Sequence, residues 1–245
     1  MTIKAVVFDA YGTLYDVQSV ADVTEQCFPG YGDLITQIWR LKQIEYTWLR
    51  SLMERYEDFT AVTRESLVFT LRCLGLAQEP AVVAQLMDRY LRLDPYPDAG
   101  STLAALGRYQ RAILSNGSPA MLKALVKATG LNQLLDATIS VDARKVFKPN
   151  PLAYTLIEQV LGTPPAEVLF VSSNPFDVCG AKSFGLNVAW IERVPAATLV
   201  QDLAQRDRIA PRTLFNILRT RPEELGFAPD YRVSALADLP AIAAG

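Results

Sequence analysis

A carboxylate stands near the start of the chain in a position suited to a nucleophile. The residues from Ile3 to Phe8 are apolar apart from Lys4, which is typical of a buried strand, and Asp9 follows directly. A turn at Gly12 comes next. In open α/β sheets, ligands bind just beyond the carboxyl ends of the strands. Asp9 is therefore predicted to act as a charged nucleophile toward a bound ligand. A purely structural aspartate at this place would be energetically unfavourable.

Further polar side chains follow the other apolar runs of the chain. If these runs are neighbouring parallel strands, their polar ends meet Asp9 at one edge of the sheet. A carboxylate, a lysine and neutral hydrogen-bonding groups gathered there are suited to nucleophilic and acid–base chemistry. The side chains that converge in this way are Thr13, Ser115, Asn116, Lys148 and the segment from Ser172 to Asp177.

The chain of 245 residues contains no histidine. This absence excludes Ser–His and Cys–His dyads and any metal site built from imidazole. Acid–base catalysis must then come from Asp, Glu, Lys or Tyr side chains.

The elements that position these side chains alternate between strand and helix. This alternation indicates right-handed crossovers and a Rossmann-like, mainly parallel sheet, so we expect the α/β fold class. The two clearest helices are predicted to close at Gly130 and Gly162. The predicted strands are 3–8, 110–114, 137–141, 168–171 and 187–191, and these helices are 119–129 and 151–161.

Residues 15–96 break the alternation and are predicted to be all helical. We expect residues 1–14 and 97–245 to form the catalytic core, and residues 15–96 to form a cap domain inserted after the first strand. The two segments in which the chain passes between core and cap would act as hinges above Asp9. The helices predicted in the cap are 33–56, 63–74 and 80–93, with Thr63 and Glu79-Pro80 as start signals.

The segment after Arg193 has a less regular apolar pattern. Short helices are predicted over 199–204 and 213–218, and a last edge strand over 231–233. No function is predicted for residues 199–228.

Composition and charge restrict the possible partners. The formal net charge is -2 and no long run of Lys or Arg occurs, which argues against nucleic acid. No apolar run approaches the roughly 18 residues of a membrane helix, and the start has no signal-peptide pattern. Cys27, Cys73 and Cys179 fit neither a zinc site nor a disulfide framework. We expect a soluble, cytoplasmic protein whose anionic substrate is held by a few local cations.

Three motifs taken together resemble the haloacid dehalogenase superfamily, and the resemblance runs the length of the chain. It implies a parallel-sheet core with an inserted helical cap. The segments that resemble its nucleophile loop, its second motif and its lysine motif are Asp9-Ala10-Tyr11-Gly12-Thr13-Leu14, Ser115-Asn116-Gly117 and Lys148-Pro149-Asn150-Pro151.

Most members of this superfamily are magnesium-dependent phosphatases. They have a second aspartate two residues after the nucleophile and an acidic cluster after the fourth strand. This chain has Tyr11 at the first place, and Ser172, Ser173 and Asn174 with the single acid Asp177 at the second. A hard cation prefers several oxygen ligands, usually carboxylates. We therefore expect no metal and no cofactor.

One branch of the superfamily has the same two features as this chain: a tyrosine two residues after the nucleophile, here Tyr11, and the pattern Ser-Ser-Asn-x-x-Asp, here residues 172–177. In both features the chain resembles the L-2-haloacid dehalogenases. The resemblance implies that Asp9 attacks the halogen-bearing carbon, expels halide and forms an ester. Water then hydrolyses this ester, so that an L-2-haloalkanoic acid becomes a D-2-hydroxy acid. Asp177, held by Asn174 and Lys148, would orient and deprotonate that water.

The same resemblance implies how the substrate is held. Arg40, Asn116 and the ring edge of Phe176 would stabilise the leaving halide. Ser115 and the backbone N–H groups around Tyr11 would hold the substrate carboxylate. Related enzymes also suggest a homodimer, for which the long cap helix offers apolar surface.

Other residues would complete the site by the same resemblance. Thr13 would act at the nucleophile, with Tyr154 and Ser172 in support. A small dry pocket would raise the nucleophilicity of Asp9 by desolvation. The residues that would line this pocket are Tyr11, Ile44, Phe59 and Phe176.

Two other functions stay open at this point. The first is a phosphate- or phosphonate-ester hydrolase of the same superfamily. A phosphonate hydrolase of that superfamily uses a lysine of its cap, and Lys42 is the single lysine of the cap predicted here. The second is a binding protein without catalytic activity. Each polar residue also has a plain structural interpretation: Asp9 could serve a turn, Thr13 and Asp177 could cap helices, and Arg40 could be solvated.

Overall fold

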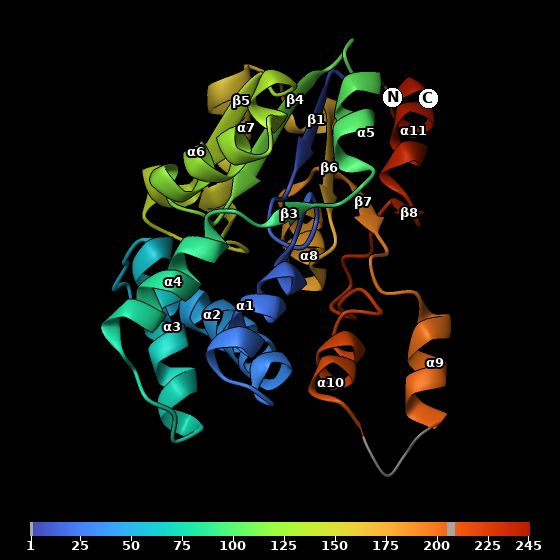
Figure 1. The fold of residues 1–245 in the computed structure, drawn as a ribbon. Helices are drawn as coiled ribbons and strands as arrows, with labels where there is room; N and C mark the ends of the chain where they lie inside the picture. The colour runs from blue at the N-terminus through green and yellow to red at the C-terminus, as the bar shows by residue number, and fades with distance from the viewer. Residues whose placement is uncertain (1, 205–208) are drawn as a thin grey trace.

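A parallel sheet carries the polar strand ends (Figure 1). The computed structural model describes residues 2–204 and 209–245. The strands of this sheet are β1 (Ala5–Phe8), β4 (Gln110–Ser115), β5 (Ala137–Ser140), β6 (Val168–Ser172), β7 (Asn187–Ile191) and β8 (Tyr231–Val233). They pair in the order β5-β4-β1-β6-β7-β8, and every neighbouring pair is parallel. This arrangement confirms the predicted α/β fold.

β1 is the strand from which the chain builds the sheet in both directions. It pairs with β4 on one side and with β6 on the other. All of its residues are buried, as the apolar run predicts. A strand at which the order reverses is a topological switch point, where ligands bind beyond the carboxyl end. Asp9 lies at this point.

Helices connect the strands, and local signals set their ends. The helix predicted over 151–161 is present with those bounds, and Gly162 closes it at a φ of 66°, which glycine adopts without steric cost. No helix in the described part of the chain is long and apolar enough to cross a membrane. The helices that accompany the sheet are α5 (Ala99–Ala105), α6 (Pro119–Ala128), α7 (Pro151–Leu161), α8 (Pro175–Phe184) and α11 (Leu239–Ala244).

Four helices lie beyond the carboxyl end of the sheet, at the lower left of Figure 1. The helix predicted to start at Thr63 begins earlier, at Phe59, because the Asp58 side chain accepts a backbone N–H hydrogen bond of the first turn. Thr63 is buried inside this helix, so it is not the start signal. The segment comprises β2 (Tyr15–Asp16), α1 (Ala21–Cys27), α2 (Gly32–Leu52), α3 (Phe59–Cys73), α4 (Pro80–Tyr90) and β3 (Asp94–Pro95), and β2 pairs antiparallel with β3.

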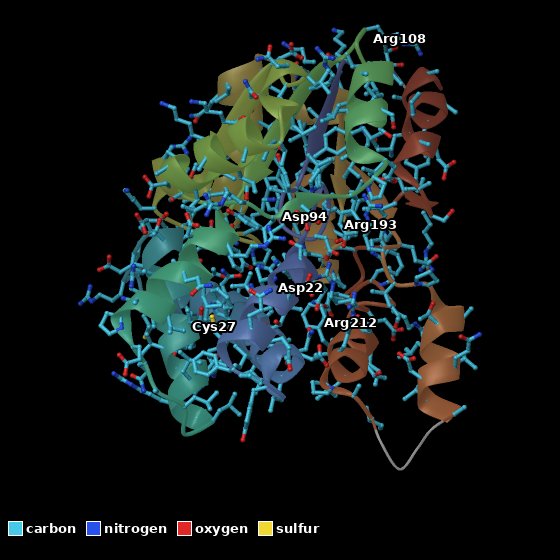
Figure 2. All side chains as sticks on the ribbon, in the orientation of Figure 1. Asp22, Cys27, Asp94, Arg108, Arg193 and Arg212 are labelled. Atoms are coloured by element: carbon cyan, nitrogen blue, oxygen red, sulfur yellow. The ribbon has the colours of Figure 1, made fainter. Side chains whose placement is uncertain are left out.

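The C-terminal part of the chain returns to these helices before it ends on the sheet. α9 (Ala196–Ala204) and α10 (Pro211–Ile217) precede β8, which is the edge strand that the sequence predicts. The backbone N–H of Arg212, labelled in Figure 2, donates to Asp33 Oδ2 of α2 over 3.2 Å. α10 is therefore tied to the helix that reaches over the strand ends.

Candidate active site

The Asp9 carboxylate is held by three side chains at the carboxyl end of β1. Its Oδ2 accepts hydrogen bonds from the Thr13 hydroxyl over 3.1 Å and from the Asn174 amide over 2.7 Å. Its Oδ1 accepts one from the Lys148 ammonium over 3.2 Å. Burial strengthens each of these contacts, because the effective dielectric constant inside a protein is low. The two oxygens differ as a result: two neutral donors fix Oδ2, and a single ammonium contacts Oδ1.

Lys148 lies between the two carboxylates of the site. Its ammonium donates to Asp9 Oδ1, to Asp177 Oδ2 over 3.0 Å and to the Leu114 carbonyl over 2.6 Å. An ammonium has three donors, and all of them are used here. These contacts explain how a lysine can be completely buried.

Asp177 is fully buried in the first turn of α8. The Tyr154 hydroxyl donates to its Oδ1 over 2.8 Å, and Lys148 holds its Oδ2. Burial raises the pKa of Asp177 from 3.8 to about 6; the charge of Asp9 adds to the rise, and Lys148 and Tyr154 oppose it. A carboxyl group with a pKa near 6 is well matched to accept a proton near neutral pH.

Asn174 contacts a different carboxylate from the predicted one. Its amide donates to Asp9 Oδ2 and, over 3.0 Å, to the Tyr11 carbonyl. The expectation that Asn174 holds Asp177 is therefore wrong. The reason is local: Asn174 occupies the N-cap position of α8 with an extended backbone (φ −90°, ψ 117°) and its side chain reaches Asp9 and Tyr11, while Asp177 lies in the first turn of the helix.

Arg40 of α2 brings a buried positive charge to the same place. Its side chain is 6% exposed, and no carboxylate of the described residues lies within ion-pair distance of it. Its Nη1 donates to Gln43 Oε1 over 2.6 Å and its Nη2 to the Tyr11 carbonyl over 3.4 Å, while Nε has no hydrogen-bond partner among residues 2–204 and 209–245. A buried guanidinium with an unused donor and no anion is suited to bind an anionic ligand.

A small cavity lies where these groups meet. Its volume is about 20 Å³, enough for about one water molecule. Nine of its lining residues are among the predicted site residues, and Thr47 joins them. The predicted lining residues are Asp9, Tyr11, Arg40, Ile44, Phe59, Asn116, Lys148, Asn174 and Phe176.

The remaining predicted residues are buried behind the wall of this cavity. The Ser115 hydroxyl accepts a hydrogen bond from the Gly117 N–H, and the Ser172 hydroxyl accepts one from the Asn174 N–H, each over 3.1 Å. Both serines thus fix the loops that follow β4 and β6. The other residues of this group, with the contacts given above, are Thr13, Tyr154 and Asp177.

Two backbone N–H groups next to Tyr11 are used within the turn itself. The N–H of Gly12 donates to the Tyr15 carbonyl over 2.7 Å, and that of Thr13 donates to the Ala10 carbonyl over 3.2 Å. Neither is available to a substrate carboxylate while the turn keeps this conformation.

Gln43 and Thr47 belong to the site although no motif marks them. Gln43 Oε1 accepts from Arg40 and, over 2.9 Å, from the Tyr90 hydroxyl, so it orients the guanidinium. Thr47 lines the cavity beside Ile44. Their distances along the chain from Arg40, three and seven residues, place them on one face of α2. This helical spacing is the signal by which they could be found from the sequence.

The side chains of the site do not fit a divalent cation. The Lys148 ammonium already lies between the carboxylates of Asp9 and Asp177. Asn174 turns its NH₂ group toward Asp9, and such a group donates and cannot ligate a metal. Over residues 2–204 and 209–245, no group of three or more His, Cys, Asp or Glu side chains is placed to hold a metal ion.

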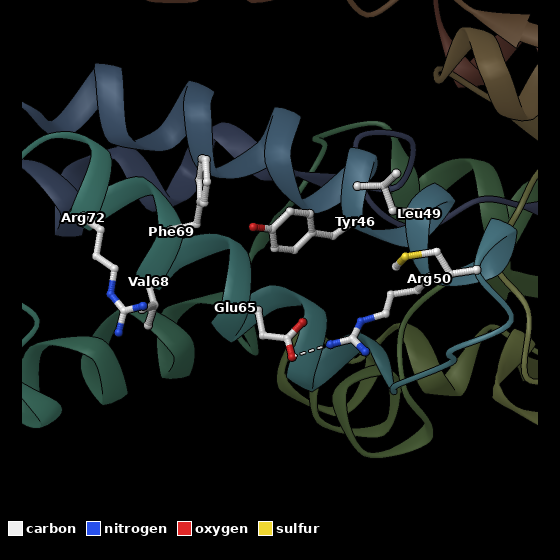
Figure 3. Close-up of a pocket in the computed structure, with 8 residues that line it drawn as sticks. Tyr46, Leu49, Arg50, Glu65, Val68, Phe69 and Arg72 are labelled. Atoms are coloured by element: carbon white, nitrogen blue, oxygen red, sulfur yellow. Dashed lines mark hydrogen bonds and ion pairs between the residues drawn. The ribbon is translucent and has the colours of Figure 1, made fainter.

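A larger cavity of about 530 Å³ lies between α2 and α3, away from the strand ends (Figure 3). Arg50 and Glu65 form an ion pair of 2.6 Å in its wall. Tyr46, Phe69 and further residues of the two helices complete the lining. It contains no residue of the Asp9 site, so the chemistry is assigned to the smaller cavity.

The sequence matches a known family over most of its length. Residues 3–185 match the haloacid dehalogenase-like hydrolases. The parallel sheet, with a buried lysine between two carboxylates at its carboxyl edge, agrees with this match. The chain belongs to the haloacid dehalogenase-like hydrolase family.

Within this family, its relatives at high identity are dehalogenases. It is 57% identical over 243 residues to the (S)-2-haloacid dehalogenase of Xanthobacter autotrophicus, covering 99% of this chain and 96% of that protein. It is 42% identical over 236 residues to the (S)-2-haloacid dehalogenase of Pseudomonas sp. (strain YL), covering 96% and 91%. The Xanthobacter L-2-haloacid dehalogenase, solved with chloropropionic acid covalently bound, matches the fold with a TM-score of 0.95 at 56% identity, covering 100% and 99%. The predicted branch is confirmed.

Proposed function

We propose that this chain hydrolyses L-2-haloalkanoic acids to D-2-hydroxy acids and halide, through an ester on Asp9. The relatives described above are haloacid dehalogenases by name, and one of them holds chloropropionic acid in a covalent bond. The chain is thus a hydrolase that acts on carbon–halogen bonds. Its own residues account for both steps of the reaction.

In the first step, Asp9 Oδ1 attacks C2 of the substrate. A carbon–oxygen bond forms, the carbon–halogen bond breaks, and the halide leaves with the bonding electron pair while C2 inverts. Oδ1 accepts one hydrogen bond, from Lys148, and so keeps a lone pair for the attack. Arg40 stabilises the halide as its charge develops, with Asn116 and Phe176 in the same cavity wall.

In the second step, water attacks Cγ of the esterified Asp9. Asp177 takes a proton from the water and returns it to Oδ1 as the ester bond breaks, so the product leaves with Oδ1 as its hydroxyl oxygen. The Asp9 carboxyl group then ionises and releases the second proton. In the tetrahedral intermediate the negative charge lies on Oδ2, where the Thr13 hydroxyl and the Asn174 amide already donate.

One observation carries this proposal: the Asp9 carboxylate and the buried Arg40 guanidinium, which has no carboxylate partner among the described residues, share one small cavity. A carboxylate that attacks carbon expels an anion, and the guanidinium provides the site for it. The ammonium of Lys148 occupies the position between the carboxylates, so the reaction does not call for a metal ion there.

The proposal is tested by halide release from L-2-chloropropionate in excess EDTA. The D-enantiomer and the Asp9→Asn variant are assayed alongside, with Asp136→Asn, a surface carboxylate paired with Arg111, as the matched control. We expect release from the L-form alone, unaffected by EDTA, abolished in Asp9→Asn and retained in Asp136→Asn.

The alternatives give different results in the same assay. No halide release, with magnesium-dependent turnover of a phosphate or phosphonate ester, would establish the ester hydrolase. No turnover of any of these substrates by the wild-type chain would indicate a binding protein built on this fold.

We further propose that the chain works as a homodimer in the cytoplasm. Leu49 and Leu52 of α2 and Met53, which directly follows it, are exposed and form an apolar surface that a second copy could cover. All three cysteines are unpaired, as in a reducing compartment. Sedimentation should give twice the 27.1 kDa of one chain, and Leu52→Glu should give a single chain.

A further inference from the structure

A buried arginine from the C-terminal part of the chain contacts the nucleophile turn. Arg219 lies just after α10 and is 8% exposed. Its Nη2 donates to Ser173 Oγ over 2.7 Å, and its guanidinium lies 5.2 Å from the ring centre of Phe215. As for Arg40, no carboxylate in the described ranges lies within ion-pair distance. Its charge is therefore not explained by a local acid.

The contact with Ser173 leads to Asp9. The Ser173 hydroxyl donates to the Gly12 carbonyl over 2.5 Å, and the Ser173 N–H donates to Thr13 Oγ1 over 2.9 Å. Thr13 in turn donates to Asp9 Oδ2. Arg219 thus fixes the serine that holds both residues following Tyr11 in the nucleophile turn.

Gly12 allows this approach. Its φ is 89°, and a Cβ built there would lie 2.9 Å from Arg219 Nη2 and 3.4 Å from Ser173 Oγ. A side chain at this position would be strained and would displace the guanidinium. The guanidinium therefore packs directly on the bare backbone of the turn.

Arg219 keeps its charge in this position. Burial, with the nearby charge of Arg40, lowers the pKa of Arg219 to about 10, which is still far above neutral pH. A charged donor makes a stronger hydrogen bond than a neutral one, so Ser173 is held firmly.

We propose that Arg219 is a positioning residue for Asp9, acting through Ser173 on the Gly12–Thr13 turn. The inference rests on the proposed dehalogenation, for which it names a residue outside the motifs. It also gives residues 209–228, which have no predicted role, a part in the reaction.

Arg219→Met, Arg219→Lys and Ser173→Ala test this inference, with Arg221→Met as the matched control. Arg221 lies on the same segment but is exposed and pairs with Glu224. We expect Arg219→Met to lower kcat for L-2-chloropropionate at least about tenfold with KM changed less than about threefold, because misplacing a reacting group by about 1 Å costs on the order of a hundredfold. Arg219→Lys should recover part of kcat, and Arg221→Met should match wild type.

The Ser173 route is tested by the double variant. If Arg219 acts through Ser173, adding Arg219→Met to Ser173→Ala should lower kcat little further, because the two changes remove one shared contact. Independent losses that multiply, an unchanged kcat in Arg219→Met, or a rise in KM alone would overturn the inference. If the wild-type chain releases no halide from L-2-chloropropionate, that result would instead refute the proposed function. If Arg219→Met does not fold, Arg219→Lys with the double variant Ser173→Ala/Arg219→Lys gives the same comparison.

Discussion

The two carboxylates of the site, Asp9 and Asp177, differ in their surroundings. Asp9 accepts hydrogen bonds from three side chains, and it lines the cavity. Asp177 is fully buried behind it, and burial raises its pKa to about 6. Two carboxyl groups in different environments can take different roles, which agrees with the proposed nucleophile and base.

The raised pKa of Asp177 sets the pH dependence of ester hydrolysis. The ionised form accepts the proton and is lost as the pH falls through the pKa, so the rate should fall below about pH 6. Tyr154→Phe removes a hydrogen bond that stabilises the carboxylate and should move this acid limb to higher pH. A shift of about one to two pH units is expected, since a hydrogen bond to a charged group contributes about 1.5–3 kcal/mol. Single-turnover decay of the ester across pH measures it.

Tyr109→Phe is the control for this shift. Tyr109 is also a buried tyrosine, but its hydroxyl accepts from Arg108, away from Asp177. The acid limb of the pH–rate profile of Tyr109→Phe should therefore match that of wild type. An acid limb in Tyr154→Phe that stays in place or moves to lower pH would show that Asp177 is not the group that titrates.

Motifs at strand ends predict the type and place of the reacting residues. Asp9 and Lys148 could be placed together because the alternating pattern predicts a parallel sheet, whose carboxyl ends lie at one edge, and because Lys148 stands in a recognisable motif. The partner of Asn174 could not, because it depends on the backbone angles of one loop residue. Arg219 could not either, because it reaches the turn by packing from an irregular segment and has no motif of its own.

The helices beyond the sheet close the cavity. Thr60 of α3 lies 2.9 Å, oxygen to oxygen, from Ser118, and the Tyr56 hydroxyl donates to Asp142 Oδ1 over 3.0 Å. The closed cavity has room for about one water molecule, and 2-chloropropionate is several times larger. We therefore propose that residues 15–96 act as a cap that moves away from the sheet to admit substrate.

A disulfide between cap and core should stop this movement. In Thr60→Cys/Ser118→Cys the two sulfur atoms take the place of hydroxyls that already touch. Oxidation should lower halide release at least about tenfold if opening is required in each cycle, and dithiothreitol should restore it. Full activity of the oxidised double variant would contradict the proposed opening of the cap in each cycle. The two single cysteine variants control for the effect of the substitutions themselves.

Elements are predicted best where one local signal decides their ends. The helix at 151–161 begins with Pro151 and closes at Gly162, and its bounds follow from these two residues. The start of α3 is harder to predict from the sequence, because both Asp58 and Thr63 are residue types that cap helices. The structure decides between them, since Thr63 donates to a carbonyl within the helix and Asp58 accepts the free N–H.

The net charge of the buried site is opposite in sign to the net charge of the chain. The chain has a formal net charge of -2. The buried groups at the strand ends are two carboxylates and three cations, which leaves one positive charge: Asp9, Asp177, Arg40, Lys148 and Arg219. A singly charged carboxylic acid would neutralise this excess, which matches a 2-haloalkanoic acid.

This excess charge predicts that a small monoanion stabilises the fold. Propionate at a hundred times its Kd should add about 2.7 kcal/mol, or about 5–10 °C in Tm for a chain of this size. Propionamide has the same shape without the charge and should give no shift. Scanning calorimetry measures both, and Arg40→Gln should reduce the propionate effect. Equal shifts from the two compounds would contradict a charge-driven site.

In the proposed reaction Oδ1 of Asp9 is transferred, while Oδ2 is held by Thr13 and Asn174, so the two oxygens would have different lifetimes in the protein. Each turnover carries the old Oδ1 away as the hydroxyl of the product and replaces it with an oxygen from water. Oδ2 stays for as long as its two hydrogen bonds keep the carboxylate from rotating. In water labelled with heavy oxygen, the first product of each chain would carry no label and every later one would, while the protein keeps one oxygen that was built in at the ribosome.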